Sequence, residues 1–209
     1  DEGRYVVPDL PEATYDVWVR GYGLVDSPKQ RVSPGTRVDL TAVVASDEQA
    51  AAQYYPSGYW YSLLEVPGPD EFPGTGQDGN GISPSVTSQG AWLRGLKSGG
   101  CTACHGLGTK ATREIPPQLG EFDSLVAAWD RRIQSGQAGG SMSGALDRMG
   151  RRRALEMYAD WTGRILAGEV PPTPPRPQGV ERNVVITQWD WADPTAYLHD
   201  EASTDKRNP

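Results

Sequence analysis

The sequence predicts a multidomain α + β protein in which a small all-helical domain is flanked by an antiparallel β-sandwich and an irregular, proline-rich tail. Three observations support this fold class. Residues 1–45 contain short segments that alternate apolar and polar side chains with period two. Residues 87–169 carry apolar side chains at helical spacing. Proline-dense segments lie on both sides of that helical region.

The β-rich segment opens the chain. We expect three short strands, separated by turns, within the β-patterned segments at residues 4–7, 14–20, 31–33 and 38–44. The residues Gly3-Arg4-Tyr5, Asp9-Leu10-Pro11, Tyr15-Asp16-Val17-Trp18-Val19 and Gly21-Tyr22 resemble the later strands of a carboxypeptidase regulatory-like (transthyretin-like) domain. In that family further strands precede the one that contains Tyr5. The resemblance therefore implies a partial β-sandwich, a chain trimmed before Asp1, and other segments or chains that complete the open edge. A simpler, intact β-meander is the alternative.

A connector is expected at residues 46–86. It contains the aromatic cluster Tyr54-Tyr55-Pro56-Ser57-Gly58-Tyr59-Trp60-Tyr61 and a Pro/Gly-rich stretch at 67–84. No basic residues interleave with the aromatic side chains, so we interpret them as packing against a neighbouring domain rather than as a sugar or nucleotide platform.

Helical spacing begins after Ser88, which can cap a helix that carries Trp92, Leu93 and Leu96 on one face. A second helix is expected at 122–134 and the longest at 151–167. A glycine-rich loop is expected between them at 136–144. The segment 170–209 reads as a proline-rich strap and a tail with one strand at 183–189, leading toward a further domain.

The net charge of −7 is unevenly distributed. The stretch 88–169 holds eleven basic and eight acidic residues, a balance of +3, and the other nine basic and nineteen acidic residues give −10. The acidic flanks disfavour nucleic-acid binding, whereas a mildly basic module suits an acidic redox partner protein. No run of 18 apolar residues is present, so we expect no membrane span.

The pentapeptide Cys101-Thr102-Ala103-Cys104-His105 carries the chemistry. Two cysteines three residues apart lie on one side of a helical turn, where both can form thioethers with haem vinyl groups, and His105 then faces the iron as proximal ligand. The preceding Gly99-Gly100 lets the backbone approach the porphyrin edge. The sequence therefore predicts one covalent haem c. A zinc site lacks further ligands nearby, and a thioredoxin-like pair would follow a strand rather than a helix.

The iron needs a sixth ligand for electron transfer. Met142 is the first candidate because it follows His105 at a distance that lets the chain cross to the opposite haem face. The alternatives are Met149, Met157, His199 and an open site, of which the two methionines are also explained by core packing. A carbonyl of the Pro116-Pro117 bend could accept the Nδ1–H of His105, although an ordinary loop breaker explains these prolines equally well.

The order helix, Cys-x-x-Cys-His, proline bend, helix, Met loop and final helix resembles a class I cytochrome c over about residues 87–168. The resemblance implies a small helical fold whose first and last helices cross, with Gly90 or Gly95 allowing close approach to Tyr158 or Trp161. It also implies a His/Met iron of fairly high potential.

An arginine cluster lies in the same region. It comprises Arg131, Arg132, Arg148, Arg151, Arg152 and Arg153. Haem propionates or a docking surface could use some of these side chains. For most of them we favour a solvated helical face with i,i+4 partners such as Glu156.

We expect an electron-transfer module of a larger periplasmic or extracellular redox protein, more an electron-transfer subunit or fragment than a catalyst. The stretches Asn183-Val184-Val185-Ile186-Thr187-Gln188-Trp189-Asp190-Trp191 and Tyr197-Leu198-His199-Asp200 resemble the entry to a further β-rich domain, such as a propeller. Two alternatives stay open. One is a haem enzyme or gas sensor with an open or labile sixth site, and the other is a carbohydrate- or partner-binding module with an auxiliary haem.

Overall fold

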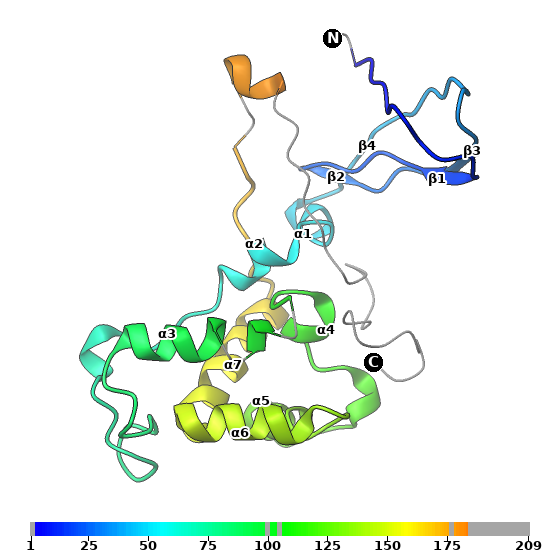
Figure 1. Cartoon of the computed structure of the whole chain (residues 1–209). Helices are drawn as coiled ribbons and strands as arrows, with labels where there is room; N and C mark the ends of the chain where they lie inside the picture. The colour runs from blue at the N-terminus through cyan, green and yellow to red at the C-terminus, as the bar shows by residue number, and fades with distance from the viewer. Residues whose placement is uncertain (1–2, 99–100, 104–105, 176–177, 184–209) are drawn as a thin grey trace. The chain divides into compact units, whose positions relative to one another are not determined.

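The computed structural model describes residues 3–98, 101–103, 106–175 and 178–183 (Figure 1). Within them the chain forms seven α-helices and two small antiparallel sheets, which confirms a mixed α + β protein. The chain divides into two compact units between Tyr54 and Tyr55.

The first unit holds both sheets. Strand β1 (Tyr15–Val17) pairs antiparallel with β3 (Gln30–Val32), and Tyr15 lies opposite Val32. Strand β2 (Leu24–Val25) pairs antiparallel with β4 (Val43–Val44). Both ladders are shorter than the sequence predicts, and the strand expected at 4–7 is not formed.

Burial explains these short ladders. In residues 3–50 the only buried side chain is that of Ser27, and apolar side chains such as Val6 and Val44 are 87% and 77% exposed. Apolar alternation stabilises a strand only where one face packs on a core, so pairing ends where no core exists. Helix α1 (Glu48–Ala52) closes this unit, with the Asp47 carboxylate accepting the Ala50 N–H at 2.8 Å.

The second unit is helical. Its helices are α2 (Ser57–Tyr61), α3 (Gln89–Lys97), α4 (Lys110–Arg113), α5 (Leu125–Arg132), α6 (Gly139–Met149) and α7 (Arg151–Leu166). Short 3₁₀ turns occur at Pro69–Glu71, Cys101–Ala103, Pro117–Leu119 and Gly179–Asn183. Two expectations are confirmed: Ser88 caps α3 by accepting the Ala91 N–H at 3.2 Å, and α7 is the longest helix.

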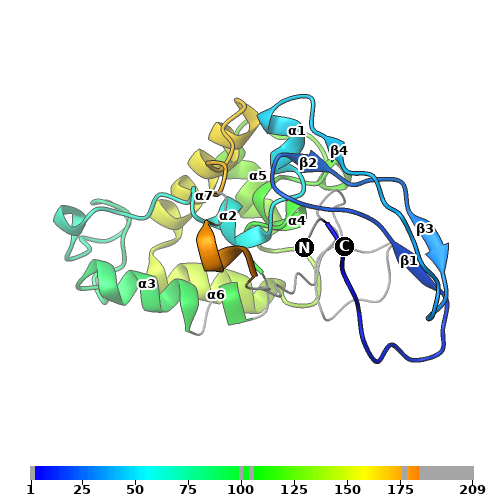
Figure 2. The ribbon, with the colours of Figure 1, turned by 90° about the horizontal axis from the view of Figure 1, so that it is seen from above.

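Helix α6 replaces most of the glycine-rich loop expected at 136–144. A Cβ atom on Gly139 would lie 2.5 Å from the Gln134 carbonyl oxygen, so this glycine permits a close approach rather than flexibility. Leu146 and Met149 are buried where α6 lies beside α3 and α7 (Figures 1 and 2). Tertiary packing therefore overrides the weak helix propensity of the glycines.

Residues 55–86, for which the sequence predicts a connector, fall in the same compact unit as the helices. Trp60 and Ile82 are fully buried. The indole Nε1 of Trp161 in α7 donates to the Trp60 carbonyl oxygen at 3.1 Å. The unit that contains the helices therefore starts before residue 87, because its core needs side chains from this segment.

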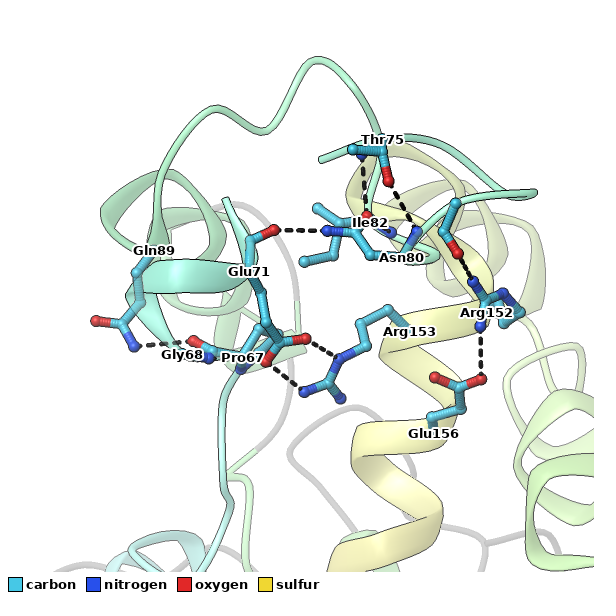
Figure 3. Close-up of polar contacts among 11 residues, drawn as sticks. Pro67, Gly68, Glu71, Thr75, Asn80, Ile82, Gln89, Arg152, Arg153 and Glu156 are labelled. Carbon is cyan, nitrogen blue, oxygen red and sulfur yellow. Dashed lines mark hydrogen bonds and ion pairs between the residues drawn. The ribbon is translucent and has the colours of Figure 1, made fainter. Parts of the chain in front are cut away.

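The loop that precedes α3 is held on the first turn of α7 by side-chain contacts (Figure 3). Arg153 donates to both carboxylate oxygens of Glu71, and Arg152 donates to the Gln77 carbonyl at 3.1 Å. Asn80 organises the loop itself, since its Oδ1 accepts the N–H groups of Thr75 and Ile82 at 3.0 and 3.2 Å. The loop is therefore fixed by satisfied polar groups and not by regular structure.

The described part of the proline-rich segment packs on the helical unit. Pro171 is fully buried, and the Tyr55 hydroxyl donates to Thr173 Oγ1 at 3.4 Å. The strand expected at 183–189 and the rest of the tail lie outside the described residues, except for the turn that ends at Asn183. Among the described helices, none is long and apolar enough to cross a membrane.

Candidate haem site

Cys101 lies just beyond the end of α3. The Thr102 hydroxyl reaches back to this helix and lies 3.2 Å from the Leu96 carbonyl oxygen and 2.8 Å from the Lys97 carbonyl oxygen. These carbonyls belong to the last turn of a helix, where intrahelical donors are missing. The second residue of the pentapeptide therefore ties the motif to the helix. Cys104 and His105 lie outside the described residues.

The side chain of Cys101 faces the core. Its Sγ lies 3.1 Å from the hydroxyl oxygen of Tyr158 in α7, and it packs against the hydrophobic cluster of the helical unit. Burial raises the pKa of Tyr158 well above its usual value, and Cys101 adds to this rise. Burial and Cys101 also raise the pKa of Tyr61. Cys101 is thus placed beside phenol groups that stay protonated at neutral pH.

The chain that follows the motif is fixed against α2. Gly108 has φ +103°, and a Cβ atom there would overlap the Ser57 carbonyl oxygen. The Gly108 N–H donates to Thr112 Oγ1, and its carbonyl accepts from Arg113 Nη1, both at 3.0 Å. These contacts hold residues 106–113 in one conformation directly after the histidine of the motif.

The sequence does not predict the buried position of Arg113. Its side chain is 1% exposed, its guanidinium carbon lies 3.9 Å from the centre of the Trp60 ring, and its Nε lies 3.4 Å from the Glu114 carboxylate. A buried guanidinium is retained where a ring, a carbonyl and a carboxylate surround it. No local pattern identifies such a residue, because Trp60 is far away in the sequence.

Met142 lies on α6, partly buried, and packs on the same hydrophobic cluster as Cys101. Met149 and Met157 are 4% and 1% exposed and serve the core. A Cβ atom on Gly95 would lie 3.2 Å from Met149 Cγ, so the close approach expected at Gly95 is made to α6 and not to Tyr158 or Trp161 of α7. His199 lies outside the described residues.

Pro116 is buried at the start of a 3₁₀ turn, and its carbonyl oxygen accepts the Leu119 N–H at 3.0 Å. A carbonyl oxygen has a second lone pair, so a bond from His105 stays a prediction.

Most of the arginine cluster is paired, but the i,i+4 contacts that the sequence predicts account for only part of the pairing. Arg152 and Glu156 form an i,i+4 ion pair at 3.1 Å, and Arg151 Nη2 lies 2.7 Å from the Asp130 carboxylate. Arg132 donates to the carbonyl oxygens of Ala111 and Glu114, and Arg131 donates to Ser135.

Arg94 of α3 and Arg148 of α6 differ from the other arginines of residues 89–166. Neither side chain has a hydrogen bond or ion pair with any part of the chain that the structure describes, whereas the side chain of each of the others has at least one. Both line a groove of about 460 Å³ with Ser85, Val86, Ala91, Gly95, Ser98, Ala145 and Met149. Two cations and no carboxylate on one groove favour an anionic contact there.

Two of the described side chains have the chemistry that a covalently attached haem requires. Cys101 and Met142 both pack against one apolar cluster. A cysteine sulfur suits thioether attachment to a haem vinyl group, and a methionine sulfur suits axial ligation of the iron. Within residues 3–98, 101–103, 106–175 and 178–183, no three His, Cys, Asp or Glu side chains gather to hold a metal ion. Comparison with protein-family models, curated proteins and solved structures finds no match to this chain.

Proposed function

We propose that this chain is an electron-transfer module that carries one haem c, bound through Cys101 and Cys104, within a larger periplasmic or extracellular redox protein. The observation that carries the proposal is the pentapeptide Cys101-Thr102-Ala103-Cys104-His105. Haem iron supplies reversible one-electron transfer when it is bound. The chain's own residues would hold it, with His105 and Met142 as axial ligands.

The packing of the three methionines supports Met142 as the second axial ligand. Met149 and Met157 fill the core, so turning either sulfur toward an iron would leave a cavity among the helices. Met142 is only partly buried and lies near the start of α6. Freeing its side chain therefore requires a smaller rearrangement than freeing Met149 or Met157.

The groove between α3 and α6 supports an acidic redox partner protein. The side chains of Arg94 and Arg148 are exposed and have no described partner, and the groove lining includes Ser98, which precedes Cys101 closely in the sequence. Charged residues around the site of electron exit raise the rate of encounter with a partner of opposite charge.

The exposed apolar side chains of the first unit support completion of its β-structure by other segments or chains. Val6, Val7 and Val44 are exposed, and both sheets have only two strands. Two-stranded sheets without a core are marginal alone and gain stability from added strands.

Intact mass of the full chain, co-produced with a haem-attachment system, tests the proposal. We expect one haem mass on the wild type, a loss of covalent haem in a Cys101→Ala/Cys104→Ala variant, and a low-spin spectrum that carbon monoxide does not change. Met142→Ala should open the iron to carbon monoxide, whereas the control Met149→Leu should not.

Rapid carbon monoxide binding by the wild type would instead favour the haem enzyme or gas sensor. A wild type without covalent haem would overturn the proposal.

A further inference from the structure

The hydroxyl of Tyr158 has an unusual environment for a buried polar group. Tyr158 is 2% exposed, and among the residues that the structure describes its hydroxyl makes one hydrogen bond, to Cys101 Sγ at 3.1 Å. A buried hydroxyl is costly unless it is satisfied, and sulfur is a weak partner compared with oxygen or nitrogen. Such a pairing is maintained in a close-packed core only where the surrounding residues hold it.

The surrounding residues do hold the ring. Tyr158 stacks on Trp129 with a centroid distance of 4.8 Å and an interplanar angle of 23°. Trp129 is fixed in turn, because its Nε1 donates to Thr162 Oγ1 at 2.9 Å, and that hydroxyl donates to the Arg113 carbonyl oxygen at 2.8 Å. The Tyr158 hydroxyl oxygen therefore cannot move toward another partner without disturbing two aromatic rings.

The direction of the bond follows from the chemistry of attachment. A thiol can donate or accept, but a cysteine sulfur that has added to a vinyl group has lost its proton and only accepts. Burial keeps the Tyr158 hydroxyl protonated at neutral pH. In the haem-bound chain the O–H bond of Tyr158 then points its positive end at the sulfur on the porphyrin edge.

We propose that Tyr158 is a positioning residue that donates a hydrogen bond to the Cys101 thioether sulfur and thereby raises the reduction potential of the haem. The inference rests on the proposed haem attachment. The reduced haem carries one more negative charge than the oxidised haem, so a fixed positive dipole at its edge stabilises the reduced state. The same bond fixes the orientation of the sulfur and hence of the attached edge.

Tyr158→Phe in the full haem-bound chain tests this inference, because it removes the hydroxyl and keeps the ring stacked on Trp129. Intact mass should show the same covalent haem, and the reduction potential should fall. Tyr55→Phe is the matched control, since Tyr55 is also buried but its hydroxyl bonds to Thr173. This control should leave the potential unchanged.

A double-mutant cycle separates the hydrogen bond from a general change in polarity. In a Cys101→Ala background the haem is held by Cys104 alone, and Tyr158→Phe should then no longer lower the potential. An equal fall in both backgrounds, or no fall in either, would overturn the inference alone. A wild type that carries no covalent haem would overturn the proposed function as well.

Discussion

Arg153 in α7 and Glu71 in the loop before α3 form a two-point ion pair, with Nε to Oε2 at 2.7 Å and Nη2 to Oε1 at 2.9 Å (Figure 3). The Gly68 N–H also donates to this carboxylate at 2.8 Å. The pair joins residues 82 positions apart and fixes the loop that carries Ile82 into the core.

The Glu71–Arg153 pair predicts a pH-dependent stability. Hydrogen bonding to Arg153 lowers the pKa of Glu71 below its usual value of 4.5, so the ionised form stabilises the fold above that value. This contribution is lost as the pH falls through the lower folded pKa. Glu71→Gln should cost about 1 kcal/mol at pH 7, and the thermal unfolding temperatures of variant and wild type should converge as the pH falls through the folded pKa of Glu71.

Glu156→Gln is the matched control for this prediction. Glu156 pairs with Arg152 on an exposed helical face, so its loss should cost at most about 0.5 kcal/mol. Equal losses of unfolding free energy in the two variants at pH 7 would show that the Glu71–Arg153 pair stabilises the fold no more than an exposed ion pair does.

Gly108 and Gly144 predict opposite effects of the same substitution. Gly108→Ala places a Cβ atom on the Ser57 carbonyl at a positive φ and should destabilise the helical unit by about 2 kcal/mol or more. Gly144 lies inside α6 and faces only the end of the Arg148 side chain at 3.5 Å. Gly144→Ala should therefore stabilise by about 0.5–1 kcal/mol. Urea unfolding of both variants measures the change in the free energy of unfolding. A Gly108→Ala protein as stable as the wild type would contradict the close approach of Gly108 to α2.

Thr102 predicts a link between the attachment motif and α3. Thr102→Val keeps the shape of the side chain and removes the hydroxyl that bonds the Leu96 and Lys97 carbonyls, at a cost of about 1 kcal/mol. Hydrogen exchange should quicken in the last turn of α3. Thr102→Ser restores the hydroxyl and should recover most of the stability; a serine variant as weak as the valine one would contradict the capping role.

Arg94 and Arg148 predict a charge-dependent rate of electron exchange. In the haem-bound chain, Arg94→Gln/Arg148→Gln should slow oxidation by the anion ferricyanide about twofold to fivefold at low ionic strength. Added salt should abolish the difference. The control Arg131→Gln/Arg152→Gln removes the same charge outside the groove and should slow the reaction less. Stopped-flow measurements give the oxidation rates. Equal slowing in both double variants would exclude the groove as the place where ferricyanide makes contact.

The sequence predicts the helical elements well where one signal acts locally. Ser88 and the apolar face of α3 identify that helix, and the stripe through Leu155 and Trp161 identifies α7. The sequence predicts a loop where the glycine-rich helix α6 forms, because sequence spacing cannot reveal the close approach of Gly139 to Gln134. The strands were overestimated because alternation does not show whether a core is present.

In the candidate site, too, local sequence signals are visible and long-range contacts are not. The residues that we propose attach the haem form one contiguous pentapeptide, so the sequence alone suffices to propose them. The contact between Tyr158 and Cys101 joins positions 57 residues apart, and Arg113 meets Trp60 only after folding. Those residues control the surroundings of the site, and only packing brings them together.

The hydrogen bond from Trp161 to the Trp60 carbonyl has a practical consequence for anyone who isolates the helical unit. A fragment that starts at residue 87 would expose the indole of Trp161 and lose the side chains of Trp60 and Ile82. The shortest fragment that contains Cys101 and folds should therefore start near Tyr55, because the aromatic segment that follows supplies part of its core.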